Sequence, residues 1–169
     1  SAMQKNIRTL KDSKLDNKTV IVRANLDVQV ENGEVVDDIR IRQMVPTIQY
    51  LMQKKCKIVI LSHLGNPKGE YKDEYSLMPV RFELGRILEK QVKFVDIENC
   101  ENSMKFMEQG DILMFENLRF HPDEQNEDSK VRKKFVAKLV EFADVYVSDY
   151  FADFKKDASL YELAKFLPS

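Results

Sequence analysis

Short apolar runs alternate with helical patterns along the chain, and this alternation restricts the possible folds more than any other feature. Residues 57–61 form a continuous apolar run of strand length, and residues 19–23, 92–95, 111–115 and 144–148 are also predicted strands. Three of the five are unbroken apolar runs. Unbroken apolar runs are typical of strands that are buried on both faces. Because strands separated by helices are joined by right-handed crossovers, the pattern predicts a parallel sheet.

The first helical pattern covers residues 38–54, where apolar residues recur at spacings of three and four. We expect Asp37 or Asp38 to cap this helix, and Pro46 to kink it or to delay its start. We also expect an Asn-Gly turn at residues 31–34, a helix over 102–109 that Gly110 closes, and further helices over 77–90, 129–142 and 160–166. The predicted fold class is α/β, a doubly wound parallel sheet with helices on both faces in a Rossmann-like three-layer arrangement.

Composition excludes several classes of function. The chain has 169 residues, of which 43% are hydrophobic, so it can bury one core of ordinary domain size. Its formal net charge is only -1, which argues against nucleic acid as a partner and requires any anion site to be a local cluster. Cys56 and Cys100 lack metal-ligand spacing and indicate free thiols in a reducing compartment, and no apolar run reaches the length of a membrane span.

Polar residues that follow the predicted strands mark the expected site. Ligands of open parallel α/β sheets gather beyond the carboxyl ends of the strands. Arg40, His63 and Arg119 come to that edge from three separate segments, and Asn25 and Asp27 follow the first strand. Because guanidinium groups match the oxygens of carboxylates and phosphates, we expect a small anion as ligand, with hydroxyl groups bound by the Asn and Asp side chains.

Each of these residues also has a purely structural interpretation. Arg40 and Arg42 can pair with the aspartates at the start of the same helix, and a lone histidine after a strand is more often a structural residue. Asn25 and Asp27 can be turn formers. Glu116 and Asn117 can hold their loop instead of touching a ligand. The sequence alone leaves these alternatives open.

Several longer segments at the same loops carry a resemblance to a known family. They read VIVRANLDV at 20–28, DDIRIR at 37–42, LSHLGNP at 61–67, ENLRFH at 116–121 and ADVYVSDYF at 143–151. In order and spacing the chain resembles the N-terminal, 3-phosphoglycerate-binding half of phosphoglycerate kinase. The resemblance implies that residues 3–169 form that single domain, that residues 1–2 are a tag remnant, and that the C-terminal nucleotide-binding domain is absent.

The resemblance also implies an activity and its partners. The family is a cytoplasmic, glycolytic enzyme that transfers a phosphoryl group between 1,3-bisphosphoglycerate and ADP. Its second domain binds Mg-ATP or Mg-ADP, so we expect this domain to bind 3-phosphoglycerate but no cofactor or metal, and to be inactive alone. By the same resemblance Arg40 contacts the substrate carboxylate and stabilises the transferring group. The substrate-binding residues that it implies are Asn25, Asp27, Arg40, His63, Leu64, Gly65, Asn66 and Arg119.

The chain departs from the family pattern at the substrate loops. The usual order of Asp and Asn after the first strand is exchanged in Asn25-Leu26-Asp27, and Asn66 replaces an arginine. A later His-Arg-x-His segment is replaced by a run that contains Lys155 and Lys156. Two lost arginines favour an alternative, a degenerate and non-catalytic homologue that serves as a structural or interaction domain. A relative that binds another phosphorylated acid is a third hypothesis.

Overall fold

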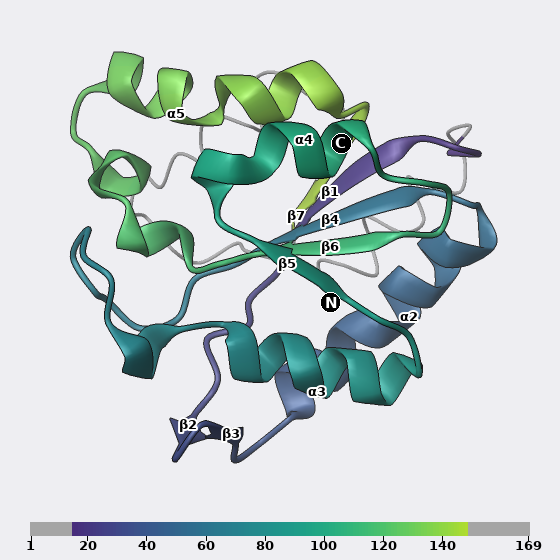
Figure 1. Ribbon diagram of the computed structural model, residues 1–169, viewed down its shortest axis with the longest axis horizontal. Coiled ribbons are helices and arrows are strands. Elements are labelled where there is room, and N and C mark those ends of the chain that lie inside the picture. Colours follow the sequence, from purple (N-terminus) through teal and green to yellow (C-terminus); the bar gives the residue numbers. More distant parts are fainter. Residues whose placement is uncertain (1–14, 149–169) are drawn as a thin grey trace.

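A computed structural model describes residues 15–148, and within that range an open sheet lies between two layers of helices (Figure 1). The predicted tag remnant at residues 1–2 and the predicted helix over 160–166 lie outside the described residues. The strands and longer helices are β1 (Thr19–Arg23), β2 (Val30–Glu31), β3 (Glu34–Val35), α2 (Ile39–Gln53), β4 (Lys57–Leu61), α3 (Met78–Leu88), β5 (Lys93–Val95), α4 (Cys100–Lys105), β6 (Ile112–Phe115), α5 (Ser129–Phe142) and β7 (Val145–Ser148).

Five of the strands form one parallel sheet, which confirms the parallel sheet predicted from the alternation. Their order is β5-β6-β4-β1-β7. β1 is inside the sheet, where Val22 pairs with Ile60 of β4 and with Val147 of β7. All carboxyl ends therefore face the same edge, and the loops that leave β1, β4 and β6 begin there side by side.

Each central strand contributes to two separate hydrophobic cores, because successive side chains of a strand point to opposite faces. In β1, Val20 and Val22 belong to the core under α2 and α3, whereas Ile21 belongs to the core under α4 and α5. The alternation is the same in β4 and β6. Helices cover both faces (Figure 1), which confirms the doubly wound α/β fold.

The hairpin of β2 and β3 projects from the sheet's ligand edge and turns at Asn32 and Gly33. Both residues have positive φ, 51° and 75°, as a two-residue hairpin turn requires. The predicted Asn-Gly turn is therefore confirmed.

The start of α2 agrees with the prediction that Asp37 or Asp38 caps the helix. Asp38 occupies the N-cap position, but the side-chain hydrogen bond comes from Asp37, whose Oδ1 accepts from the Ile39 N–H at 3.0 Å. Pro46 lies inside the helix, so it does not delay the start of the helix.

The predicted helix over 102–109 is wrong at both ends. α4 begins at Cys100, directly after a 3₁₀ turn (Ile97–Asn99), and it ends at Lys105. Gly110 lies five residues further on, because the carboxylate of Asp111 accepts from the Glu108 N–H at 2.9 Å and forms a separate turn. The side chain of Asp111 thus stabilises a turn directly before β6, and Gly110 belongs to this turn and not to the end of α4.

Candidate functional site

The loop after β1 is held to the start of α2 by Arg40. Its Nη1 donates to Asn25 Oδ1 at 3.1 Å and to the Asp27 backbone oxygen at 2.8 Å. Within residues 15–148, Arg40 Nε and Nη2 make no hydrogen bond, so they are available to a carboxylate or phosphate. Arg42, in contrast, pairs with Asp38 at 2.8 Å, so the structural interpretation holds for Arg42 and not for Arg40.

The loop after β4 meets the loop after β1 through its backbone. The Leu26 N–H donates to Ser62 Oγ at 3.0 Å, and the Gly65 N–H donates to Asp27 Oδ1 at 3.0 Å. Gly65 has a φ of +59°, and a Cβ at this position would lie 2.5 Å from the ring of Tyr75. Only glycine fits this position without strain, and its backbone can therefore reach Asp27.

His63 lies almost fully buried beneath this loop, with 2% of its surface exposed. Arg23, the last residue of β1, donates from Nη2 to His63 Nδ1 at 3.0 Å. Since a guanidinium has no acceptor, Nδ1 must be the accepting nitrogen and the ring proton must be on Nε2. That nitrogen lies 3.9 Å from Asp27 Oδ2, within ion-pair range but beyond hydrogen-bond distance.

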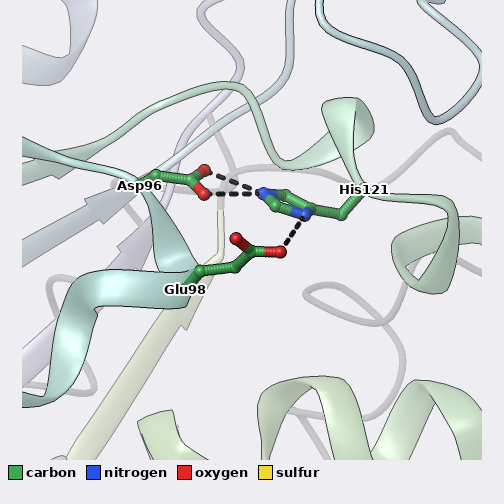
Figure 2. Close-up of side chains that lie close together, drawn as sticks. All are labelled: Asp96, Glu98 and His121. Atoms are coloured by element: carbon green, nitrogen blue, oxygen red, sulfur yellow. Dashed lines mark hydrogen bonds and ion pairs between the residues drawn. The ribbon is translucent and has the colours of Figure 1, made fainter.

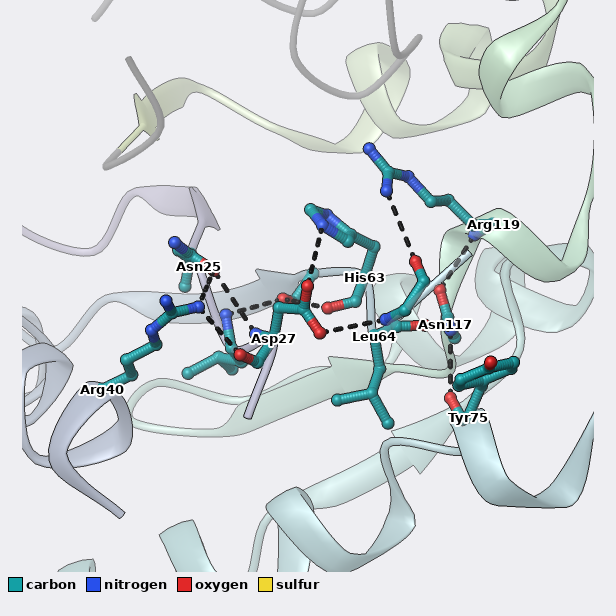
Figure 3. A network of polar contacts seen from close by, with 12 residues as sticks. Asn25, Asp27, Arg40, His63, Leu64, Tyr75, Asn117 and Arg119 are labelled. Carbon is teal, nitrogen blue, oxygen red and sulfur yellow. Dashed lines mark hydrogen bonds and ion pairs between the residues drawn. The ribbon is translucent and has the colours of Figure 1, made fainter. Parts of the chain in front are cut away.

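Arg119 completes the cluster from the loop after β6. Its Nη1 donates to the Gly65 carbonyl oxygen at 3.4 Å, and its backbone N–H donates to Asn117 Oδ1 at 3.0 Å. Gly65 therefore bridges Asp27 and Arg119. Figure 3 shows Asp27 between Arg40 on one side and Arg119 on the other, with His63 beside it.

Asn117 and Glu116 hold the loops together, as their structural interpretation proposes. The buried Asn117 donates from Nδ2 to the backbone oxygens of Leu64 at 2.7 Å and Tyr75 at 3.0 Å. Glu116 accepts from the Leu77 N–H at 2.8 Å and from Ser76 Oγ at 2.7 Å. Both residues join segments that are about 40 or more positions apart and fix the cluster's geometry.

The structure thus joins most of the predicted site residues into one network, namely Asn25, Asp27, Arg40, His63, Leu64, Gly65 and Arg119 (Figure 3). Asn66 directly follows Gly65, but it is exposed and lines a hollow with Lys68 and His121. The sequence analysis assigned no site role to Arg23, the last residue of β1. A charged residue that ends an otherwise apolar strand was the available signal.

A second polar cluster consists of Asp96, Glu98 and His121 (Figure 2). Among the residues that the structure describes, one ligand atom from each lies within 4.8 Å of the others, and these are metal-ligating residue types. However, His121 Nε2 already lies 2.8 and 3.0 Å from the two oxygens of Asp96, and Nδ1 lies 3.6 Å from Glu98. A cation would have to displace a ring proton, so the geometry fits an ion pair better.

The pKa shifts of this pair agree with an ion pair. The hydrogen bond from His121 to Asp96 raises the pKa of His121, against the effect of burial. Burial acts to raise the pKa of Asp96, but the hydrogen bond and charge of His121 outweigh it and lower that pKa. The cluster therefore ties the loop after β5 to the loop after β6.

Fold and site together define an open α/β domain with a preformed, arginine- and histidine-containing ligand cluster at the carboxyl edge of its parallel sheet. A family model described as phosphoglycerate kinase matches residues 10–169. The chain belongs to the phosphoglycerate kinase family.

Known relatives agree with this assignment. The chain is 39% identical over 166 residues to the phosphoglycerate kinase of Pelotomaculum thermopropionicum, covering 96% of this chain and 41% of the relative. It is 41% identical over 167 residues to that of Moorella thermoacetica, covering 95% and 41%. The chain thus spans about two fifths of the length of the curated relatives that it matches.

Solved structures show the same likeness. The phosphoglycerate kinase of Pyrococcus horikoshii OT3 superposes with a TM-score of 0.83 and 30% identity, over 94% of this chain and 40% of that chain. That of Coxiella burnetii gives a TM-score of 0.79 and 31% identity, over 94% and 39%. Within residues 15–148, no helix is both long and apolar enough to cross a membrane.

Proposed function

We propose that this chain is the N-terminal, 3-phosphoglycerate-binding domain of a phosphoglycerate kinase, which acts in glycolysis in the cytoplasm. The observation that carries the proposal is the bridge at Gly65, which brings Asp27 and Arg119 to one position beside His63. A small acid with a carboxylate and a phosphate requires cationic or donor groups from several directions, and the start of α2 and the loops after β4 and β6 supply them here.

Arg40 would contact the carboxylate of the substrate and stabilise the transferring phosphoryl group. The hydrogen bonds that Arg40 Nη1 donates to Asn25 and to the Asp27 backbone orient the guanidinium before any ligand binds. Arg119 would contact the phosphate, and His63 would donate from Nε2. Preorganised donors of this kind contribute through positioning and charge neutralisation, which dominate phosphoryl transfer.

Mg-ATP and Mg-ADP would bind to the C-terminal domain of the full-length enzyme, which is also this domain's partner. Because the chain spans only about two fifths of its relatives' length, we expect the isolated chain to show no phosphoryl transfer. We expect no cofactor or metal in this domain.

Titration of 3-phosphoglycerate into the chain tests the proposal. We expect dissociation constants in the millimolar range or tighter, and Arg40→Ala to weaken binding about tenfold or more, since it removes a charge-assisted contact. Arg42→Ala is the matched control, because it removes the same charge from the same helix. Arg42 pairs with Asp38, so it is not expected to contact the ligand. Equal effects of the two variants would contradict a specific role for Arg40.

The alternative is a degenerate, non-catalytic homologue, and Asn66 favours it. This residue stands in place of an arginine, and it faces a different hollow from the network around Asp27. No binding of 3-phosphoglycerate by the folded chain would support this alternative. Binding of another phosphorylated acid, without binding of 3-phosphoglycerate, would support the third hypothesis, a relative with a different substrate. Lys155 and Lys156, which replace the lost arginine segment, lie outside the described residues.

A further inference from the structure

The carboxylate of Asp27 lies where the donors of the candidate site converge. Its Oδ1 accepts the Gly65 N–H at 3.0 Å, and its Oδ2 lies 3.9 Å from His63 Nε2. In Figure 3 this side chain lies between the Arg40 and Arg119 side chains. The backbone donor and the imidazole that an acidic ligand would use thus face a carboxylate of the chain itself.

The donors are fixed in place more firmly than the carboxylate is. His63 is buried, and Arg23 holds its Nδ1 at 3.0 Å, so the Nε2–H keeps its direction. Gly65 is held from the other side by Arg119. The side chain of Asp27, in contrast, is 41% exposed, and its backbone is fixed separately through the bond from Arg40 to its carbonyl oxygen.

We propose that the Asp27 carboxylate is an internal anion that occupies the Gly65 N–H, places a negative charge beside His63, and weakens the binding of phosphorylated acids. This inference rests on the proposed function. An acid that binds to the Gly65 N–H must first displace the Asp27 carboxylate from it. The negative charges of the bound acid are then repelled by the nearby carboxylate. Both effects lower affinity, because like charges at short distance repel even in partly exposed sites.

Asn25 shows why the position of the charge matters more than its presence. Its amide oxygen accepts from Arg40 Nη1 at 3.1 Å, whereas the side chain that accepts the Gly65 N–H is that of Asp27. A carboxylate at position 25 would pair with Arg40, whereas a neutral amide at position 27 would still accept the Gly65 N–H and would add a donor. Exchanging the two residues changes the location of the charge and leaves the total charge unchanged.

The test is a calorimetric titration of 3-phosphoglycerate into the 169-residue chain at low ionic strength, where charge effects are least screened. We expect Asp27→Asn to bind about tenfold more tightly than the unmodified chain. The exchange variant N25D/D27N should also bind more tightly, since it too removes the charge from position 27. Asp16→Asn is the charge-matched control, because exposed Asp16 precedes β1 and lies at the opposite edge of the sheet.

The outcomes separate this inference from the proposed function. Tighter binding by both position-27 variants, with Asp16→Asn unchanged, supports the inference. If the unmodified chain binds in an Arg40-dependent manner and Asp27→Asn binds equally or more weakly, the inference is wrong while the proposed function stands. If neither folded protein binds at ligand concentrations of about 10 mM, both are wrong. An equal gain in Asp16→Asn would assign the effect to net charge and overturn the inference.

Discussion

Several charged side chains lie fully or almost fully buried near the ligand edge of the sheet. Arg23 and Glu124 have 0% of their surface exposed, and Arg132 has 2%. Arg23 donates to the Ala24 oxygen and to His63, and Arg132 donates to the backbone oxygens of Asn126 and Glu127. Burying charge is costly unless it is paired and hydrogen-bonded, so these contacts restrict how the site can rearrange.

Tyr146 of β7 lies in the same buried surroundings. Burial is the main cause that raises its pKa to about 12, and the charge of Glu124 adds to the effect. The hydrogen bond with Ser148 and the charge of Arg23 act in the opposite direction. The phenol therefore stays neutral at any pH at which the protein would be studied.

The first prediction concerns the His121–Asp96 pair. Because the pKa of His121 is raised, its contribution to stability is complete below pH 6.5 and is lost as pH rises through the folded-state value. Because the pKa of Asp96 is lowered, its contribution is complete above pH 3.8 and is lost as pH falls through its folded-state value. The pair should therefore stabilise the fold fully only between these two values.

Urea denaturation of the unmodified chain and of His121→Asn at about pH 5.5 and about pH 9 measures this effect. We expect the variant to lower the free energy of unfolding by on the order of 1 kcal/mol at the lower pH and by less at the higher pH. Asp96→Asn should reproduce the pattern. A cost that grows with pH would contradict the ion pair.

At the scale of elements, the five strands of the parallel sheet and the bounds of α5 could be predicted from sequence, whereas the bounds of α4 and the two short strands of the hairpin could not. β1 and β4 match their predicted residues because their side chains are buried on both faces and leave an unbroken apolar run. α4 was misplaced because the turn before β6 depends on a side-chain contact of Asp111. In α5, buried Arg132 breaks the apolar pattern, since its partners belong to the preceding loop.

The candidate site divides in the same way. Arg40, His63 and Arg119 could be predicted because strand ends of a parallel sheet share one edge. The bridge through Gly65 and the contacts of Asn117 could not, because they join residues 38 to 54 positions apart through backbone atoms. Whether each polar residue touches a neighbouring loop or faces the site depends on such contacts, which no local pattern encodes.

The second prediction separates backbone strain from steric conflict in two loops. Gly33 and Gly65 both have positive φ, but a Cβ at Gly33 would have no atom within 4 Å, whereas at Gly65 it would meet Tyr75 at 2.5 Å. Gly33→Ala should lower the free energy of unfolding by about 1 kcal/mol, from strain alone. Gly65→Ala should cost about 3 kcal/mol, from strain and overlap together.

Chemical denaturation of both variants gives these values. In a chain that already carries Tyr75→Ala, Gly65→Ala should lower the free energy of unfolding by less than it does in the unmodified chain. The ring that the new Cβ would meet is then absent, whereas the strain of the positive φ remains. Equal costs at the two glycines would show that the ring of Tyr75 moves aside freely.

At the scale of the whole molecule, the two hydrophobic cores each contain one of the two cysteines. Cys56 packs in the core under α2 and α3, and Cys100 in the core under α4 and α5. Burial raises the pKa of Cys56 to about 11 and also raises the pKa of Cys100. Since the thiolate is the reactive form, both thiols should be unreactive in the folded protein.

The third prediction follows from this arrangement. A thiol reagent such as DTNB should label neither cysteine of the folded chain at neutral pH on the timescale of minutes, and should label both in denaturant. The single variants Cys56→Ser and Cys100→Ser identify which core opens first when labelling is followed at intermediate denaturant. Rapid labelling of either thiol in native buffer would show that its core is open to solvent.

The strand order has a consequence for how such a chain is made on the ribosome. β1 pairs on one side with β7, and the Thr19 N–H donates to Asp144 Oδ2 across 125 positions of sequence. A nascent chain that ends before Asp144 therefore keeps one side of β1 unpaired, with its backbone donors and acceptors open to other chains. Translation must proceed almost to the last described residue before the first strand is enclosed, so the polypeptide is most exposed to misassembly during its own synthesis.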